Sequence, residues 1–235
     1  MIDKHRLITE ARALGIDAEQ ACADKLDAFC ELLVEANKCV NLTAITQPRQ
    51  IEVKHLLDSL FAAAQPEVRG EVADIGCGAG FPGVVIAALK AECRVTLVDA
   101  TNKKLVFARS ACDSANIRAD TVHGRAEELA HLGQYRESFD CVTARAVANL
   151  TVLSEYCLPF LKIGGAFIAM KGPEADNEID GARATIKALG GELDSVRRCT
   201  LPDSSERSLI IIKKISQSPP KYPRPSKDIA KGAIK

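Results

Sequence analysis

A glycine-rich turn with two aspartates has the residue types and spacing of a nucleotide-binding site. Residues 72–83 have the sequence VADIGCGAGFPG, a short apolar run followed by a turn. Its polar and glycine positions are Asp74, Gly76, Gly78, Gly80 and Gly83. Glycine lets the backbone approach a ligand closely, because no Cβ atom stands in the way. Asp99 lies 19 residues after Gly80, where an acidic side chain can accept both hydroxyls of a ribose.

Two nucleoside ligands fit this turn, a dinucleotide such as NAD and S-adenosylmethionine. The spacing G-x-G-x-x-G, which begins at Gly78, also occurs in dinucleotide sites and permits an NAD-dependent oxidoreductase. Later segments favour S-adenosylmethionine. The sequence GRAEE at 124–128 follows an expected strand, where an acidic group can contact the adenine amino group, and Gly-Gly at 164–165 precedes another strand. A plain tight turn, with Asp99 as a strand-end cap, is the remaining interpretation.

A second group of polar side chains, His55, Asp58 and Ser59, is spaced i, i+3, i+4 in an expected helix. That spacing places all three on one helix face. We expect His55 to orient other groups by hydrogen bonding rather than to act as a base. Arg145 and Lys171 each end an expected strand, where Arg145 can serve the cofactor or the substrate and Lys171 can contact a phosphate. The alternatives are a local His–Asp pair for His55 and Asp58, a surface ion pair for Arg145 and an ordinary surface lysine for Lys171.

Strands that alternate with helices must position these side chains. The expected strands are at 72–75, 94–98, 121–123, 139–144, 166–170, 195–200 and 209–215. The expected helices are at 83–89, 103–114, 126–132, 149–161 and 174–189. This order predicts an α/β fold with a doubly wound, mostly parallel sheet. No helix separates the last two strands, so they form a hairpin at one edge. Ligands of such sheets bind outside the carboxyl ends of the strands.

The two ends of the chain differ in character from this central part. Residues 1–65 are expected to form a helical extension, with helices at 2–14, 18–38 and 46–64, packed on a core domain at 66–215. Residues 216–235 are rich in proline and are expected to be extended and lightly held. From Lys213 onward there are seven Lys or Arg and one Asp, which leaves a net charge of −6 on the rest. A basic tail suits an anionic partner, although a solvated terminus has the same composition.

Cysteine and histidine usage argues against disulfides and metal ions. Nine cysteines include no C-x-x-C pair, and the four histidines have no metal-ligand spacing. We expect reduced thiols, no metal and a cytoplasmic location. The sequence begins with no signal-peptide pattern, and no apolar run approaches the ~18 residues of a membrane span.

Several motifs, taken together, resemble those of the RsmG (GidB) family. They are NLTAI from Asn41, HLLDSL from His55, DIGCGAGFPG from Asp74, RAEE from Arg125, ARA from Ala144 and KG from Lys171. The resemblance covers about residues 25–215. It implies a class I S-adenosylmethionine-dependent methyltransferase with a seven-stranded Rossmann-like sheet whose last strand is antiparallel. The implied substrate is N7 of a guanine in the 530 loop (position 527) of 16S ribosomal RNA, with S-adenosylhomocysteine as product.

The resemblance also implies roles for individual residues. Those at the cofactor are Gly76, Phe81, Asp99, Ala126, Glu127 and Arg145, and those facing the guanine and its neighbours are Asn41, His55, Asp58, Ser59 and Lys171. Guanine N7 has a lone pair and no proton, so alignment matters and no general base is needed. Asp58, Asn41 and Ser59 are all suitable to hold the guanine edge. A basic tail, with local Lys and Arg patches, is expected to bind RNA.

Other interpretations of the function are a small-molecule methyltransferase and a non-catalytic RNA-binding module with the same fold. The form of the RNA substrate, whether free, in an assembling particle or in the small ribosomal subunit, is open at this stage. A monomer without an obligate protein partner is expected, although the sequence leaves the oligomeric state open.

Overall fold

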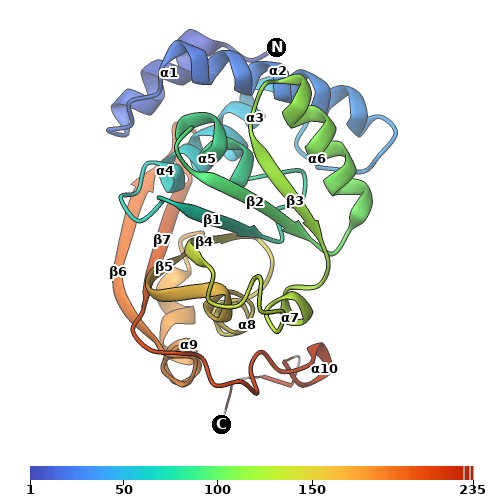
Figure 1. The fold of residues 1–235 in the computed structure, drawn as a ribbon. Helices are drawn as coiled ribbons and strands as arrows, with labels where there is room; N and C mark the ends of the chain where they lie inside the picture. The colour runs from blue at the N-terminus through green and yellow to red at the C-terminus, as the bar shows by residue number, and fades with distance from the viewer. Residues whose placement is uncertain (230, 233, 235) are drawn as a thin grey trace.

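A seven-stranded sheet lies between helices in the computed structural model, which describes residues 1–229, 231–232 and 234 (Figure 1). The strands are β1 (Glu71–Ile75), β2 (Arg94–Asp99), β3 (Ala119–His123), β4 (Phe139–Arg145), β5 (Leu161–Lys171), β6 (Gly191–Thr200) and β7 (Glu206–Lys214). Their order is β3-β2-β1-β4-β5-β7-β6, and β7 is antiparallel to both neighbours. The predicted α/β sheet with an antiparallel last strand is confirmed.

Helices cover both faces of this sheet (Figure 1). One face carries α5 (Gly83–Leu89) and α6 (Asn102–Ser114), over which lie α1 (Lys4–Ala13), α2 (Gln20–Asn37), α3 (Pro48–Ile51), η1 (Glu52–Leu57) and α4 (Asp58–Ala63). The other face carries α7 (Ala126–Leu129), α8 (Leu150–Cys157), η2 (Leu158–Phe160) and α9 (Ala175–Ala188), and the short helix α10 (Ser226–Ile229) follows β7. Within the described part of the chain, no helix has the length and apolarity needed to cross a bilayer.

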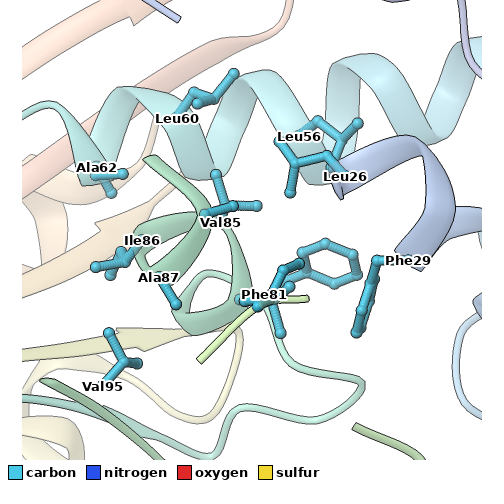
Figure 2. Close-up of a cluster of buried hydrophobic side chains, with 14 of the residues drawn as sticks. Leu26, Phe29, Leu56, Leu60, Ala62, Phe81, Val85, Ile86, Ala87 and Val95 are labelled. Atoms are coloured by element: carbon cyan, nitrogen blue, oxygen red, sulfur yellow. The ribbon is translucent and has the colours of Figure 1, made fainter. Parts of the chain in front are cut away.

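Alternating side chains of the central strands supply two separate apolar cores. In β5, Phe167 belongs to the core beside α8 and α9, and the next residue, Ile168, belongs to the core beside α5 and α6. A period of two residues is what a strand buried on both faces requires. Figure 2 shows part of the core beside α5 and α6, where the rings of Phe81 and Phe29 meet edge to face. The centroids of these two rings are 5.7 Å apart.

The predicted helix at 46–64 is divided into α3, the π-helix η1 and α4. A π-helix closes its hydrogen bonds over five residues, so its turn holds more residues than an α-helical turn. His55 and Asp58 nevertheless both contact Arg145, whereas Ser59 is fully buried, so the predicted shared face holds for the first two residues only. Single π-helical turns occur frequently at functional sites.

Other differences from the predicted elements have local causes. The helix predicted at 149–161 ends at Cys157, and a 3-10 turn follows, because Pro159 has no N–H and disfavours a helical residue before it. The helix predicted at 126–132 is a single turn, α7. The predicted strands at 166–170 and 195–200 are the C-terminal parts of the longer β5 and β6.

Glu52, in η1, joins the N-terminal helices to one another. Its fully buried carboxylate accepts hydrogen bonds from Arg6 Nε at 2.9 Å and Arg49 Nη1 at 3.1 Å. A buried carboxylate is tolerated only when it is paired in this way. Apolar side chains of residues 1–65 lie in the same core as those of α5. The division of the chain near residues 65 and 215 stays a prediction.

The C-terminal segment, residues 216–229, is not lightly held, so this prediction was wrong. Arg136 donates to the carbonyl oxygens of Ser218 at 2.8 Å and Tyr222 at 2.9 Å. The Tyr222 ring is buried in the core beside α8. Proline-rich composition predicts an extended backbone, but it gives no information about donors elsewhere in the chain that bind the free carbonyl groups.

Two of the lysines counted with the tail belong to the sheet. Lys213 and Lys214 lie in β7, and Lys214 is 1% exposed. Its Nζ donates to the carbonyl oxygen of Leu158 at 2.8 Å. Burial lowers the pKa of Lys214 to about 8, against the opposing effect of Glu137. Neither lysine is part of a free basic tail.

Candidate active site

The glycine turn borders a pocket of about 190 Å³ at the carboxyl ends of the parallel strands, where doubly wound sheets bind ligands. We call it the glycine-loop pocket, and its lining includes Ile75, Gly76, Val98, Asp99, Arg125, Ala126, Glu127, Val147 and Tyr156. Among the predicted cofactor residues, those in this lining are Gly76, Asp99, Ala126 and Glu127. The remainder, Asp74, Gly78, Gly80, Phe81 and Arg145, lie outside it.

The Asp99 carboxylate is held at this pocket by main-chain donors. Its Oδ2 accepts from the N–H of Gly78 at 2.8 Å, and its Oδ1 accepts from the N–H of Thr101 at 2.7 Å. Each carboxylate oxygen can accept more than one hydrogen bond, so acceptor capacity is left for a ligand. A fixed acceptor at the end of β2 is suited to the hydroxyls of a ribose.

Gly76 leaves room for the pocket because it has no side chain. Its φ is +71°, and a Cβ atom there would lie 2.5 Å from Cγ2 of Val147. Both the left-handed backbone and the close approach of Val147 exclude other residue types. A glycine cradle beside a fixed carboxylate suits the adenosine part of S-adenosylmethionine, so the residues present fit this cofactor.

Asp74 supports the turn from beneath rather than lining the pocket. Its fully buried carboxylate accepts from the Gly83 N–H at 2.8 Å and from Thr143 Oγ1 at 3.1 Å. Burial raises the pKa of Asp74 to about 7, and these two hydrogen bonds oppose the shift. Gly83 has to be glycine for close packing, since a Cβ there would lie 2.2 Å from Leu97. Asp74 thus joins the strand end, the glycine turn and α5.

A second pocket, of about 410 Å³, adjoins the first. We call it the arginine pocket, and its lining is Ile45, Lys54, His55, Asp58, Arg145, Ala146, Met170, Lys171, Gly172 and Arg207. The two pockets meet at the end of β4, where Ala146 borders the arginine pocket and Val147 borders the glycine-loop pocket. Ala146 has a φ of +55°, which is uncommon for alanine and is found mostly where the surrounding structure imposes it, often at functional sites.

Arg145 is the centre of the arginine pocket. Its guanidinium donates to the Lys54 carbonyl oxygen at 2.9 Å and to Asp58 Oδ2 at 3.0 Å, and it contacts His55 Nδ1 at 3.1 Å. The other carboxylate oxygen of Asp58 lies 3.1 Å from Nε of Arg207. Asp58 therefore holds two guanidinium groups at the same pocket.

His55 is fixed on both of its ring nitrogens and on one ring face. Its Nε2 lies 3.0 Å from Thr43 Oγ1, and its ring stacks on Phe81 with the centroids 4.6 Å apart and the planes 5° from parallel. Burial, together with the positive charge of Arg145, lowers the pKa of His55 to about 3. The ring is neutral near pH 7, and its Nδ1 accepts from Arg145. Phe81 thus supports His55 from outside the pocket lining, and its own ring packs edge to face against Phe29 (Figure 2).

The structure brings His55, Asp58, Arg145 and Lys171 together at the arginine pocket. Lys171 Nζ contacts Glu178 at 2.7 Å and the Ala148 carbonyl oxygen at 2.8 Å. Two predicted residues lie elsewhere. Ser59 is fully buried, and its Oγ has no hydrogen-bond partner among the described residues. Asn41 is exposed and does not line the pocket.

Sequence reasoning missed four residues of this site. Lys54 and Arg207 line the arginine pocket, and Thr43 holds His55. Asn37 fixes the turn that carries Thr43, because its Oδ1 accepts from the N–H groups of residues 42 and 43 at 2.8 and 3.0 Å. Thr43 lies in the NLT motif and Lys54 directly precedes His55, so both stood beside residues already singled out. Nothing in the local sequence marks Arg207.

Comparison with known proteins agrees with this geometry. A family model described as GidB, rRNA small subunit methyltransferase G, matches residues 22–210. A curated relative from Pelotomaculum thermopropionicum, named Ribosomal RNA small subunit methyltransferase G, is 43% identical over 218 residues, which cover 91% of each chain. A protein of the same name from Lactobacillus acidophilus is 45% identical over 202 residues, covering 83% of this chain and 84% of that one.

Solved structures with the same fold are more distant in sequence. An O-methyltransferase from Bacillus cereus, in complex with S-adenosylhomocysteine, has a TM-score of 0.55 at 18% identity and covers 80% of this chain and 91% of that chain. An S-adenosylmethionine-dependent O-methyltransferase from Thermotoga maritima has a TM-score of 0.50 at 17% identity, covering 80% and 72%. The sheet order and these neighbours show an S-adenosylmethionine-dependent methyltransferase fold. With the family model matching residues 22–210, the chain belongs to the GidB family of rRNA small subunit methyltransferases.

Proposed function

We propose that the protein transfers the methyl group of S-adenosylmethionine to N7 of a guanine in the 530 loop of 16S ribosomal RNA, at position 527. The observation that carries the proposal is the pair of adjoining pockets. One fits adenosine, and the other is lined by four cationic side chains, Lys54, Arg145, Lys171 and Arg207. Relatives named as small-subunit ribosomal RNA methyltransferases support the choice of substrate.

The residues of the arginine pocket suit a reaction that needs alignment rather than a base. S-adenosylmethionine, when bound, supplies a methyl group on a positively charged sulfur. Guanine N7 has a lone pair in the ring plane and carries no proton, so no proton has to be removed. His55 is neutral and held on both nitrogens, which suits a positioning role beneath Arg145. We assign His55 and Arg145 to the shape and charge of the pocket.

Asp58 is our candidate for the guanine edge. Of the three residues considered from the sequence, it is the one that lines the arginine pocket. Two arginines hold its carboxylate in a fixed orientation, and each oxygen keeps acceptor capacity for a donor on the base. Lys54, Lys171 and Arg207 are then suited to contact phosphate groups of the RNA. This cationic lining favours an RNA over a neutral small molecule as the substrate.

We further propose that the enzyme uses no metal ion and acts as a monomer in the cytoplasm, where small ribosomal subunits are built. A lone pair that attacks a sulfonium methyl group needs no Lewis acid, and no proton transfer has to be assisted. The nine cysteines are all free thiols in the structure, and seven of them are buried, which fits a reducing compartment. Either the ribosomal RNA or the small subunit that contains it is the partner.

The test is to map tritiated methyl groups that the purified protein transfers to ribosomal RNA from cells lacking it. We expect label at one guanine of the 530 loop, recovered as 7-methylguanine. Free RNA, assembling particles and mature small subunits are offered in parallel, and the fastest transfer identifies the natural substrate. Label at another nucleotide, or transfer to small molecules alone, would contradict the proposal.

Calorimetry separates the proposal from an NAD-dependent oxidoreductase. We expect S-adenosylhomocysteine to bind and NAD to give no measurable heat. Tight binding of NAD without binding of S-adenosylhomocysteine would overturn the assignment of the glycine-loop pocket.

A further inference from the structure

A serine of the C-terminal segment reaches the wall of the glycine-loop pocket. The Oγ of Ser226 donates a hydrogen bond to Oε1 of Glu127. Glu127 is 7% exposed and lines the pocket together with Asp99. One oxygen of a pocket carboxylate is therefore engaged by a residue 99 positions away in the chain.

Buried partners fix the position of this segment. Arg224 donates through Nε and Nη2 to the two oxygens of Glu155 at 2.9 and 2.7 Å, and its own N–H donates to the same side chain at 2.8 Å. Glu155 is 1% exposed. Charge-assisted bonds with two parallel contacts are among the strongest in proteins, so Arg224 anchors the chain two residues before Ser226.

A second anchor lies on the other side of Arg224. His131 Nε2 is 2.8 Å from the carbonyl oxygen of Pro223, and the Tyr222 ring is buried in the core beside α8. In Figure 1 the segment runs past α9 and beneath α8 and ends at α10, below α7. Residues 222–226 are thus bound along the outside of the wall formed by α7 and α8.

Glu127 borders two cavities, one on each side of α7. It lines the glycine-loop pocket and also a cavity of about 250 Å³ on the outer side, next to Pro223, Pro225 and Ser226. Among the described residues, the cation paired with Glu127 is Arg125, whose Nη1 is 3.9 Å from Glu127 Oε1 and whose side chain is 61% exposed. An exposed guanidinium at that distance orients the carboxylate weakly. Ser226 is the closer and better-fixed partner.

We propose that Ser226 is a positioning residue for cofactor recognition. It holds Oε1 of Glu127, which directs Oε2 toward the pocket as an acceptor for the exocyclic amino group of adenine. The C-terminal segment is then a built part of the cofactor site rather than an arm for RNA. This inference rests on the proposed function, since it assigns the glycine-loop pocket to the adenosine of S-adenosylmethionine.

The experiment compares S-adenosylhomocysteine with S-inosylhomocysteine, in which a carbonyl oxygen replaces the amino group of adenine. Both are titrated by calorimetry into the full-length protein and into Ser226→Ala and Ser226→Thr. In Ser226→Ala we expect binding of S-adenosylhomocysteine to weaken by roughly threefold to tenfold, the size of one lost hydrogen bond. The preference for the adenine compound should fall by the same factor. Ser226→Thr keeps a hydroxyl and should restore both values.

Ser195→Ala is the matched control, because Ser195 also donates to a carboxylate, Asp194, but lies on the edge strand β6. It should leave both ligands unaffected, and RNA affinity should not change in any of the variants. If the wild type and Ser226→Ala prefer S-adenosylhomocysteine over S-inosylhomocysteine by the same factor, the inference about Ser226 is wrong, while the proposed function still stands. If the wild type does not bind S-adenosylhomocysteine, the proposed function fails, and the inference fails with it.

Discussion

The two adjoining pockets have opposite charge. The glycine-loop pocket is lined by the carboxylates of Asp99 and Glu127, with Arg125 as its cation. The arginine pocket is lined by two lysines and two arginines, with Asp58 as its carboxylate. A positively charged sulfonium compound suits the first, and a polyanion suits the second. A chain with zero formal net charge can therefore bind two ligands of opposite charge in two neighbouring pockets.

The pockets also differ in what holds their key side chains. Main-chain N–H groups of the neighbouring turns fix Asp99. Arg145 is fixed by groups from distant parts of the chain, including the carboxylate of Asp58 and the ring of His55. Loss of Asp99 removes one acceptor from a backbone frame that remains intact. Loss of Arg145 leaves several partners in a buried place without their counterpart.

The largest effect is therefore expected for Arg145→Ala. Arg207 still pairs with Asp58 after this change, but the Lys54 carbonyl oxygen and His55 Nδ1 lose their donor, which costs about 1–3 kcal/mol. We expect the free energy of unfolding to fall by about that amount, measured with urea, and kcat/KM for methyl transfer to fall more than ~100-fold. Arg145→Lys keeps the charge but loses the planar fork, so it should lie in between.

Arg198→Ala is the control for this prediction, since Arg198 forms an exposed ion pair with Asp176. Exposed pairs contribute at most about 1 kcal/mol. If Arg145→Ala and Arg198→Ala have equal stability, the side chains of the arginine pocket do not act as a unit.

Asp99→Ala tests the other side of the comparison. We expect the affinity for S-adenosylhomocysteine to fall by roughly 10- to 100-fold, the size of one or two hydrogen bonds to a charged group. Affinity for the RNA should stay the same, because Asp99 does not line the arginine pocket. Calorimetry measures the first and filter binding the second. Asp120→Ala, an exposed change on neighbouring β3, is the control, and a parallel loss of RNA affinity would show that the pockets are not separable.

The glycine-loop pocket was largely predictable from the sequence, and the arginine pocket only in part. The glycines, Asp99 and Glu127 of the glycine-loop pocket lie at or just after the ends of strands. Those strands can be recognised from the apolar pattern of the local sequence, so the positions of these residues follow from the order of the elements. The π-helical turn at 52–57 is decided by tertiary packing, and no local pattern shows that Ser59 is fully buried and outside the pocket. The approach of Arg207 to Asp58 depends on the register of β7, which no local pattern encodes.

His55 provides a pH test of the same network. Its pKa is about 3 in the folded protein against 6.5 for a free side chain. Between these values the unfolded chain carries a proton on His55 and the folded protein does not, so stability falls as the pH falls. This residue should contribute a loss of ~1.4 kcal/mol for each pH unit below 6.5. Urea unfolding at pH 7.5 and 5.0 should show a smaller pH effect in His55→Gln than in the wild type.

His5→Gln is the matched control for this measurement, because His5 is exposed on α1. It should leave the difference in unfolding free energy between the two pH values unchanged. An identical pH effect in wild type and His55→Gln would mean that His55 is not held neutral by burial and by Arg145.

The smallest effect is expected for Lys54→Gln, and it examines the charge difference directly. Lys54 is half-buried, lines the arginine pocket and lies beside His55 in η1. If its ammonium contacts one phosphate of single-stranded RNA, the slope of log affinity against log salt should become less steep by about 0.7. RNA binding should weaken only a few-fold near physiological salt, and S-adenosylhomocysteine affinity should not change. Lys187→Gln, an exposed change on α9, should leave the slope as it is. An unchanged slope in Lys54→Gln would contradict a phosphate contact and reduce the cationic side of this pocket to its arginines and Lys171.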